Sequence, residues 1–329
     1  MSTEPLVSIV TPVYNQASMI EQTLVSVASQ TYPRVEHIVI DGGSTDGTVD
    51  AIKSFAQHHP LTWISEPDDG MYDVINKGLA RAQGDILAYL NGDDLYLPWS
   101  VEVAAQEIRK GADFVYGDLA IVKRNKKRFF VQFYPPFNMN LYTHFETIAQ
   151  PTMFWRKAVY QIVSGFDASF KYAGDSEYWL RGGAADFGFS HVHEILAIQV
   201  DHDQTLRKTF TTGLNAELRR IKEMYTKDAG PPRHPRWNAV QRALVWRLRQ
   251  SQLLLAMRAS RPKKWARFVE WLRTGVAVES RRPWWTMLPG PLWPREPTLA
   301  DFASIDRKLA AEFGDGNSPS TERPKATPL

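Results

Sequence analysis

The amino-acid sequence predicts an α/β fold in which a mostly parallel, mixed sheet is flanked by helices. The first observation is that short apolar runs alternate with segments whose apolar residues recur at helical spacing. The second is that a polar loop follows each of the first four apolar runs. Strands that alternate with helices build a parallel sheet covered on both faces, so the pattern favours this class.

The predicted elements follow one another as strand–helix units. In the first unit, a buried strand precedes Ile20, Leu24 and Val27, which recur at helical spacing. In the fourth unit, Pro98 suits the first position of a helix. We expect strands at 7–14, 35–41, 61–65 and 85–90, and helices from about residue 20, at 47–58, at 71–82 and from residue 98.

The chain changes character after residue 111. Strands are expected at 112–118 and 129–134, and a mixed segment continues to about residue 202. The remainder is helical, basic and rich in tryptophan until it reaches a polar tail. We therefore expect a catalytic α/β domain over 1–204, a helical C-terminal extension over 205–313 and a disordered tail over 314–329.

Composition limits the possible functions. The 329 residues are 43% hydrophobic and 23% charged, which is typical of a folded soluble protein. A net charge of only +3 argues against a nucleic-acid partner, and the absence of cysteine excludes disulfides and thiolate chemistry. No signal peptide is recognisable, and no run approaches the ~20 apolar residues of a membrane span. We expect a cytoplasmic protein that can contact the inner face of a membrane.

The polar loops predict a ligand site. In a parallel sheet, ligands bind beyond the carboxyl ends of the strands. Neither G-x-G-x-x-G nor the P-loop sequence is present, so a phosphate would be bound chiefly through a cation. The loops that meet at this edge are 11–15, 41–47, 66–70 and 91–94.

Asp93 and Asp94 are the candidate ligands for that cation. Two adjacent carboxylates at the end of a buried strand cost stability unless a positive charge compensates them. Their hard oxygen atoms suit Mg²⁺ or Mn²⁺, and such an ion would also neutralise a diphosphate leaving group. The alternative is a solvated turn, because Asn-Gly-Asp-Asp is favourable turn chemistry.

Four segments together resemble the family-2 inverting glycosyltransferases of GT-A fold, and most of all the bacterial branch that builds cell-surface polysaccharides. The segments are "SIVTPVYNQ", "VIDGGSTDGT", "EPDDGMYDVINKG" and "YLNGDDLYLP". The resemblance covers about residues 6–202. It implies a nucleotide-sugar donor, a divalent metal ion, and transfer to an acceptor hydroxyl with inversion at the anomeric carbon.

The resemblance also implies roles for residues of the first two loops. Thr11, Pro12 and Tyr14 would border the nucleotide. Asp41 would accept a hydrogen bond from the base, although a carboxylate at this position could equally cap the helix that follows.

In the third and fourth loops, the resemblance places further donor and metal contacts. Asp93 would face the ribose or the metal, and Asp94 would be the principal metal ligand. Asp73 would lie against the donor. The alternative for Asp73 is a surface ion pair with Lys77, four residues along the same helix.

The segment "GFDASFKYAGDSEYWLRGG" resembles the family's second signature, in which Asp175 matches the general base. Glu177 is a rival, and Asp175 could instead N-cap the helix over 176–181. Trp179 is either a core residue or a platform for the acceptor sugar. Gln150 matches an acceptor contact, and His202 stands where some relatives bring a histidine to the metal.

The C-terminal region lies outside the resemblance and is strongly basic. Residues 205–285 hold 19 lysines and arginines against 5 acidic residues, and seven of the eleven tryptophans lie in 237–293. A basic amphipathic helix with tryptophan suits an anionic membrane surface. Four apolar residues recur at helical spacing in this region, namely Trp265, Phe268, Leu272 and Val276. The alternative is that this apolar face of a helix packs on protein.

The sequence therefore predicts a hexosyltransferase-type enzyme that builds a glycan or lipid-linked glycan for the cell surface. Two alternatives stay open. One is a catalytically silent relative that acts as a binding or scaffolding subunit. The other is a metal-dependent nucleotidyltransferase, which would release pyrophosphate instead of a nucleoside diphosphate.

Overall fold

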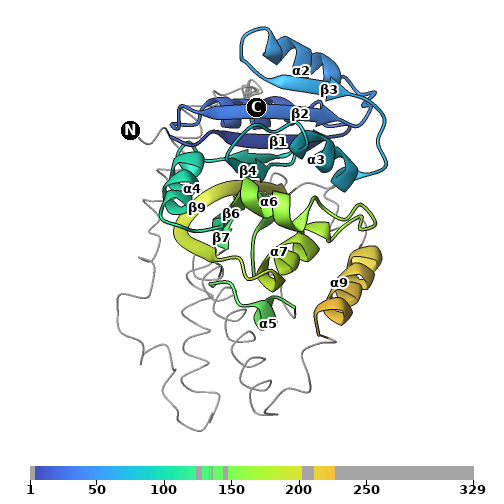
Figure 1. The fold of residues 1–329 in the computed structure, drawn as a ribbon. Coiled ribbons are helices and arrows are strands. Elements are labelled where there is room, and N and C mark those ends of the chain that lie inside the picture. The colour runs from blue at the N-terminus through green and yellow to red at the C-terminus, as the bar shows by residue number, and fades with distance from the viewer. Residues whose placement is uncertain are drawn as a thin grey trace, which may run out of the picture. The chain divides into compact units, whose positions relative to one another are not determined.

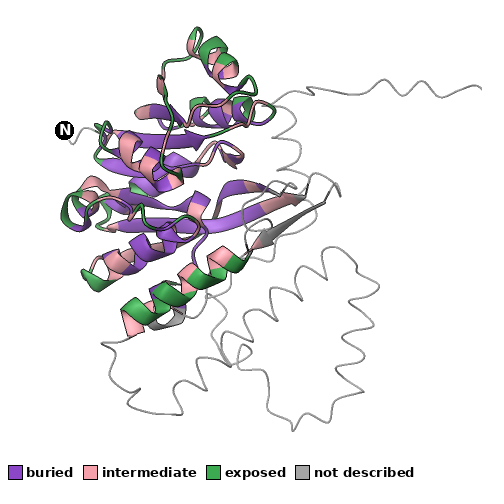
Figure 2. Cartoon of the chain, turned by 90° about the vertical axis from the view of Figure 1, so that its right-hand side faces the viewer, coloured by how far each residue is buried: buried purple, intermediate pink, exposed green. Residues whose placement is uncertain are grey.

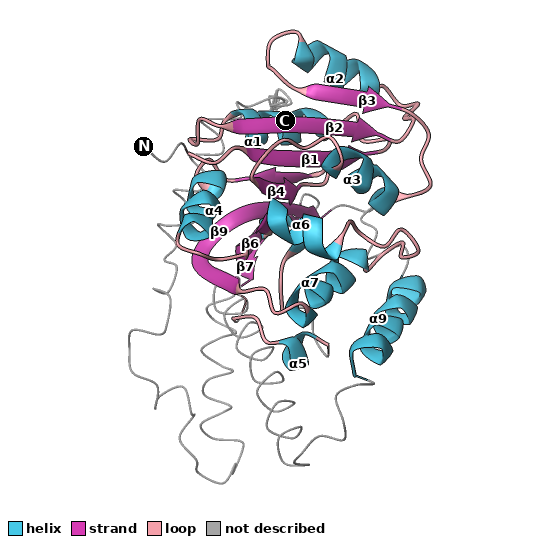
Figure 3. Ribbon diagram, viewed as in Figure 1, coloured by secondary structure: helices cyan, strands magenta, loops and turns pink. Residues whose placement is uncertain are grey.

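The computed structural model describes residues 4–123, 128–132, 134, 136–143, 147–201 and 211–226. All of them belong to the first of the two units into which the chain divides, Met1–Val269. The predicted α/β class is confirmed, because one mixed sheet lies between helices (Figures 1 and 3).

The sheet of the described residues has the order β3-β2-β1-β4-β8-β6-β9-β5, and β7 pairs with β6. β1 runs parallel to β2 and β4, and β2 runs parallel to β3, so the carboxyl ends of the first four strands share one edge. β8 is antiparallel to both β4 and β6. The strands are β1 Val7–Val13, β2 Val35–Asp41, β3 Thr62–Ser65, β4 Ile86–Tyr89, β5 Asp94–Tyr96, β6 Phe114–Lys123, β7 Arg128–Gln132, β8 Phe154–Arg156 and β9 Phe189–Asp201.

Helices cover both faces of this sheet (Figure 3). Two of them begin slightly differently from the prediction: α2 starts after the left-handed Gly47, and α4 starts at Ser100, two residues after Pro98. The helices are α1 Ile20–Ala28, α2 Thr48–Ala56, α3 Met71–Leu79, α4 Ser100–Arg109, α5 Met139–Tyr142, η2 Gln150–Thr152 (a 3₁₀ turn), α6 Lys157–Val163, α7 Gly174–Ala184 and α9 Thr211–Thr226.

The central strands are apolar on both sides because each side faces a layer of helices. Along β4, Leu87 and Tyr89 join the apolar cluster under α3 and α7, while Ile86 and Ala88 join the cluster under α4. Each fully buried aliphatic or aromatic side chain contributes roughly 1.5–3 kcal/mol to stability. The strands are accordingly the most buried part of the fold (Figure 2).

α9 lies beyond residue 204 and packs against α7. Its Ile221 is 3% exposed and belongs to the same apolar cluster as α7. Its Glu217 accepts hydrogen bonds of 2.8–2.9 Å from the backbone N–H groups of Lys171, Tyr172 and Ala173, just before α7. α9 therefore holds the start of α7. Among the described helices, none is long and apolar enough to cross a membrane.

Candidate functional site

The turn at residues 91–94 links the end of β4 to β5. The N–H of Gly92 donates to the carbonyl of Pro12 at 3.2 Å, which ties the turn to β1. Asp94 opens β5, where it pairs with Gln199 of β9. Asp94 is only 2% exposed, whereas Asp93 is half-buried. The predicted pair of aspartates therefore lies at the strand-end edge of the sheet, with the second carboxylate almost fully buried.

Unpaired acceptor oxygens surround this turn. Gln16 Oε1 and Asn91 Oδ1 are buried and receive no hydrogen bond from the described residues. A Cβ on Gly92 would lie 2.3 Å from Gln16 Oε1, so glycine is needed for this close approach. Buried acceptors without a donor cost free energy, and a cation would satisfy them. Amide and carboxylate oxygens are both ligands that Mg²⁺ and Mn²⁺ prefer.

Gln150 supports the same turn. Its Oε1 accepts a hydrogen bond from Asn91 Nδ2 at 3.1 Å, and its Nε2 donates to the carbonyl of Tyr89 at 3.0 Å. The structure thus shows Gln150 holding the end of β4 and the first residue of the turn. An acceptor contact for Gln150 stays a prediction.

Asp175 lies in the first turn of α7, where it contacts Tyr72 of α3. Tyr72 Oη lies 3.4 Å from Asp175 Oδ1, and the N–H of Asp175 donates to Tyr72 Oη at 3.2 Å. The N–H of Ser176 also donates to Oδ1, at 2.8 Å. The N-cap of α7 is Ala173, so the interpretation of Asp175 as the N-cap residue is wrong.

Two buried phenols, Tyr72 and Tyr89, lie between Asp175 and the end of β4. Burial raises the pKa of Tyr89 well above its ordinary value, and the charges of Asp175 and, more weakly, Asp94 raise it further. Burial also raises the pKa of Tyr72, with Asp175 as the next contributor. The rings of Tyr72 and Tyr89 both contact Phe166, with centroids 5.6 and 5.4 Å away, so the phenol that contacts Asp175 lies close to the end of β4.

Glu177 and Trp179 face the interior instead of the site. Both Glu177 oxygens are engaged, by Arg181 at 3.0 and 2.8 Å and by the Tyr225 hydroxyl at 2.9 Å. Glu177 is 3% exposed, so its interpretation as a rival general base is wrong. Trp179 is 0% exposed, and its ring packs edge-on against Phe114. It is a core residue and offers no surface to an acceptor sugar.

Of the three residues predicted to border the nucleotide, Tyr14 is the accessible one. It is 60% exposed at the end of β1. Thr11 is fully buried, and its Oγ1 lies 2.9 Å from His37 Nε2 inside the sheet, so its side chain cannot reach a ligand. Pro12 is also buried. Burial lowers the pKa of His37 to about 3, so this imidazole is neutral.

The Asp41 carboxylate organises its own loop. It accepts hydrogen bonds from the N–H groups of Gly43 and Ser44 at 3.0 Å each, from Ser65 Oγ at 2.7 Å and from Ser44 Oγ. Asp41 is 0% exposed, and a carboxylate has about four acceptor positions. The N-cap of α2 is Gly47, so Asp41 does not cap that helix, and at 0% exposure its carboxylate is not accessible to a base.

Asp68, a residue without a predicted role, lies over Gly42 in the loop that follows Asp41. A Cβ on Gly42 would lie 1.9 Å from Asp68 Oδ2 and 3.6 Å from the Tyr14 ring. The half-buried Asp68 carboxylate therefore sits directly over Gly42, beside the exposed Tyr14. The only signal for it in the sequence is its position in "EPDDG", where two adjacent aspartates compete for the role.

Asp73 forms the ion pair that was the alternative to donor contact. Its Oδ2 lies 3.0 Å from Lys77 Nζ, which also contacts Glu66 at 3.2 Å. The hydrogen bond from Lys77 to Asp73 raises the pKa of the lysine. Donor contact by Asp73 stays a prediction. His202 and the segment 237–293 lie outside the described residues.

The fold is of the GT-A type, because solved glycosyltransferases of that type share this mixed sheet with flanking helices. A mannosyltransferase from Pyrobaculum calidifontis, in complex with GDP-Man and Mn²⁺, has a TM-score of 0.53 at 19% identity and covers 96% of this chain and 89% of its own. S. aureus TarS 1-349 in complex with UDP-GlcNAc has a TM-score of 0.54 at 17% identity, with coverage of 67% and 66%. This chain spans 39% of a longer TarS chain.

The chain belongs to glycosyl transferase family 2, and it is a glycosyltransferase. Residues 8–170 match that family. The uncharacterized glycosyltransferase Rv1514c of Mycobacterium tuberculosis is 32% identical over 188 residues, which cover 55% of this chain and 70% of the relative. Glycosyltransferase AglE of Haloferax volcanii is 28% identical over 222 residues, which cover 64% and 73%. The family resemblance predicted from the four strand-end segments is confirmed.

Proposed function

We propose that this glycosyltransferase moves a sugar from a nucleotide-diphosphate donor to a hydroxyl group of a glycan or lipid-linked glycan, with inversion. The observation that carries the proposal is the contact between Asp175 on α7 and Tyr72 on α3. Tyr72 and Tyr89, at the end of β4, both pack on the ring of Phe166, and the buried Asp94 follows at the start of β5. Asp175 would accept the proton and Asp94 would hold the metal ion in one site.

Asp93 and Asp94 would hold the divalent ion, Mg²⁺ or Mn²⁺, and the buried oxygens of Gln16 and Asn91 support this assignment. When bound, the ion supplies positive charge to the leaving diphosphate. The burial of Asp94 excludes water from its carboxylate, which strengthens its attraction for a cation. The Mn²⁺ and nucleotide sugar in the complex of the Pyrobaculum mannosyltransferase are consistent with this role.

Asp175 would take the proton from the acceptor hydroxyl as that oxygen attacks the anomeric carbon. Direct displacement of this kind inverts the configuration and needs a base opposite the leaving group. The Ser176 N–H and the Tyr72 hydroxyl both contact Oδ1, so they fix the rotation of the carboxylate. Because its rotation is fixed, the Asp175 carboxylate keeps the oxygen that accepts the proton in position for the reaction.

Asp68 and Tyr14 would recognise the base of the donor. Asp68 carries a carboxylate above Gly42, and the exposed Tyr14 ring lies beside it. A carboxylate accepts a hydrogen bond from a base N–H, and an aromatic ring stacks on a base. This pairing takes the place of the predicted contact with Asp41, whose oxygens are already used inside the loop.

We further propose that the enzyme works at the cytoplasmic face of a membrane, in the synthesis of a cell-surface glycan. The basic, tryptophan-rich segment 237–293 supports this. Each basic residue near an anionic surface adds about 1 kcal/mol. Flotation with anionic liposomes tests the idea: binding should be strong at low salt and lost at high salt, and failure to float at any salt would contradict it.

A thermal-shift screen of nucleoside diphosphates tests the donor and metal assignment. A ligand that binds only the folded state raises the melting temperature. We expect a shift with Mn²⁺ that chelator abolishes, and we expect Asp94→Asn to lose it. Asp50→Asn, an exposed acidic position in the first turn of α2, is the control and should behave as wild type. An undiminished metal-dependent shift in Asp94→Asn would contradict the assignment.

A further inference from the structure

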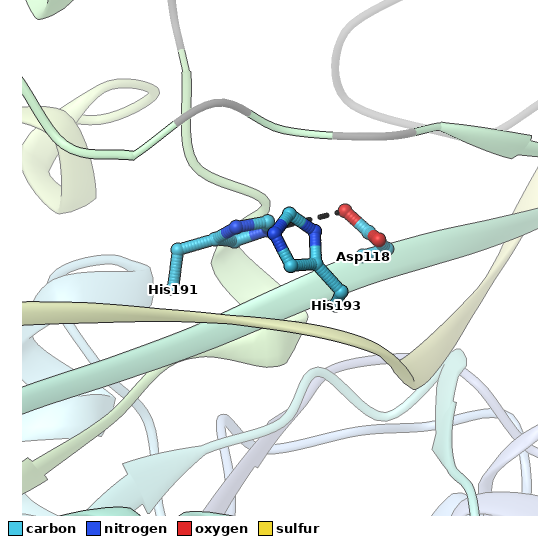
Figure 4. Close-up of side chains that lie close together, drawn as sticks. All are labelled: Asp118, His191 and His193. Atoms are coloured by element: carbon cyan, nitrogen blue, oxygen red, sulfur yellow. Dashed lines mark hydrogen bonds and ion pairs between the residues drawn. The ribbon is translucent and has the colours of Figure 1, made fainter. Parts of the chain in front are cut away.

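Asp118, His191 and His193 form a cluster of metal-binding side chains outside the strand-end site. One donor atom from each lies within 4.8 Å of the others (Figure 4). Asp118 belongs to β6, and both histidines belong to β9. Along β9, His193 is six residues from Gln199, the partner of Asp94, which corresponds to about 20 Å at ~3.3 Å per residue. The cluster is therefore separate from the aspartate pair.

An irregularity in the pairing of β6 and β9 brings the three side chains together. Tyr116 pairs with His191, but Asp118 pairs with Ile195, so β9 holds extra residues between these two points. A Cβ on Gly117 would lie 2.5 Å from the carbonyl oxygen of Glu194, so only glycine allows the strands to approach here. Bulges of this kind redirect side chains, and this one sets Asp118 beside both histidines.

The distances fit coordination of one ion. His191 Nε2 lies 3.2 Å from Asp118 Oδ1, and both side chains are almost fully buried. With metal–ligand distances of about 2.1 Å, neighbouring ligand atoms of a tetrahedral site are about 3.4 Å apart. The N–H of Tyr134 donates to Asp118 Oδ1 at 2.9 Å and so orients the carboxylate.

His191 would use Nε2 as its metal-binding atom, because this nitrogen faces Asp118 at 3.2 Å. An ion bound there would take the place of the Nε2 proton and leave the imidazole proton on Nδ1, which is buried. His193 is exposed, so an ion can enter from solvent and His193 can move to complete the site.

We propose that Asp118, His191 and His193 bind a divalent ion of the Zn²⁺ type, which links β6 to β9. Two imidazoles and one carboxylate suit Zn²⁺ better than Mg²⁺, and three protein ligands leave a fourth position for water. Since the Tyr134 backbone is bound to the same carboxylate, the ion also stiffens the chain that follows β7. The proposal does not depend on the sugar-transfer reaction.

Zinc titration of the full chain tests the proposal, in the presence of excess Mg²⁺ to occupy hard oxygen sites. His193→Gln is the main variant because its side chain is exposed, and His58→Gln, an exposed histidine after α2, is the matched control. We expect wild type and His58→Gln to bind one more Zn²⁺ than His193→Gln does. We also expect Zn²⁺ to raise their melting temperatures and leave that of His193→Gln unchanged.

Co²⁺ provides a second measurement, because its visible absorption reports coordination by imidazole. The proposal predicts an absorption band in wild type that is lost in both His193→Gln and Asp118→Asn. Equal Zn²⁺ stoichiometry and equal affinity in wild type and His193→Gln would overturn the proposal and leave the cluster as a hydrogen-bonded pair with a neighbouring histidine. If Asp118→Asn does not fold, the exposed His193→Gln decides the outcome alone.

Discussion

Tyr72 and Asp175 are joined by two contacts although they lie 103 residues apart in the sequence. The Tyr72 ring also lies against Gly174, where a Cβ would be 2.7 Å from the ring, so glycine at the start of α7 makes this approach possible. Helix α3, which follows the third strand-end loop, thereby positions the proposed general base on α7. One buried phenol thus connects α3 with the first turn of α7.

Tyr72→Phe should change the pH dependence of transfer more than its maximum rate. The neutral phenol stabilises the charged carboxylate of Asp175, and its loss makes protonation of that carboxylate easier. We expect the acid limb of the kcat/KM profile to move to higher pH by up to about one unit. Tyr32→Phe is the control, because Tyr32 is buried and its hydroxyl donates to the Pro5 carbonyl away from the site. Identical profiles for wild type and Tyr72→Phe would show that the contact has no effect on the base.

Glu217→Ala should destabilise the catalytic domain. Three backbone N–H groups before α7 would lose their acceptor, and hydrogen bonds to a charged group contribute about 1.5–3 kcal/mol each when buried. Because Glu217 is half-exposed, we expect a total loss of about 2 kcal/mol in the free energy of unfolding, measured with urea. Glu223→Ala, at an exposed position on the same helix, should change stability by less than about 0.5 kcal/mol. Similar losses in both variants would contradict the role of Glu217.

Asp68→Asn should weaken binding of the nucleoside diphosphate by about tenfold or more, as measured by calorimetry. A charge-assisted hydrogen bond to the base would be lost, and about 1.4 kcal/mol corresponds to a factor of ten. Asp69→Asn changes the exposed neighbour and should bind as wild type does. Unchanged affinity in Asp68→Asn would remove this residue from base recognition.

His37 should make the protein less stable in mild acid. Its pKa is lowered from 6.5 to about 3 in the fold, so below pH 6.5 the unfolded chain binds a proton that the folded chain excludes. Its contribution to stability is complete above pH 6.5 and declines by about 1.4 kcal/mol per pH unit toward pH 3. His37→Gln keeps a polar group near Thr11 and should flatten this slope between pH 6.5 and 4.5 in urea unfolding. A slope as steep as that of wild type would assign the acid sensitivity to other groups.

The sequence predicts the first half of the fold well because its signals are local. β1, β2 and β4 are apolar runs buried on both faces, and their periodicity differs clearly from that of the helices. β5 was not predicted, since Asp94–Tyr96 is only three residues long and depends on pairing with β9. Short strands of this kind are defined by tertiary contacts that a local pattern does not contain.

The position of a site residue could be predicted from the sequence where it did not depend on the direction of the side chain. The adjacent Asp93 and Asp94 mark the strand end by charge alone, and the structure places them there. Trp179 and Asp68 show the limit: a tryptophan four residues after Asp175 belongs to the core, and the Asp68 carboxylate lies over a glycine 26 residues away in the sequence. Which way a side chain points depends on packing between distant elements.

Single-turnover transfer by Asp175→Asn tests the central claim most directly. The change keeps the shape of the side chain and removes the proton acceptor, so turnover should fall by roughly 10²–10⁴-fold. Donor affinity and melting temperature should stay within error of wild type. Asp186→Asn, at an exposed left-handed position after the same helix, is the matched control and should keep full activity. Near-wild-type turnover in Asp175→Asn, with donor and metal bound as usual, would contradict the assignment of Asp175 as the general base.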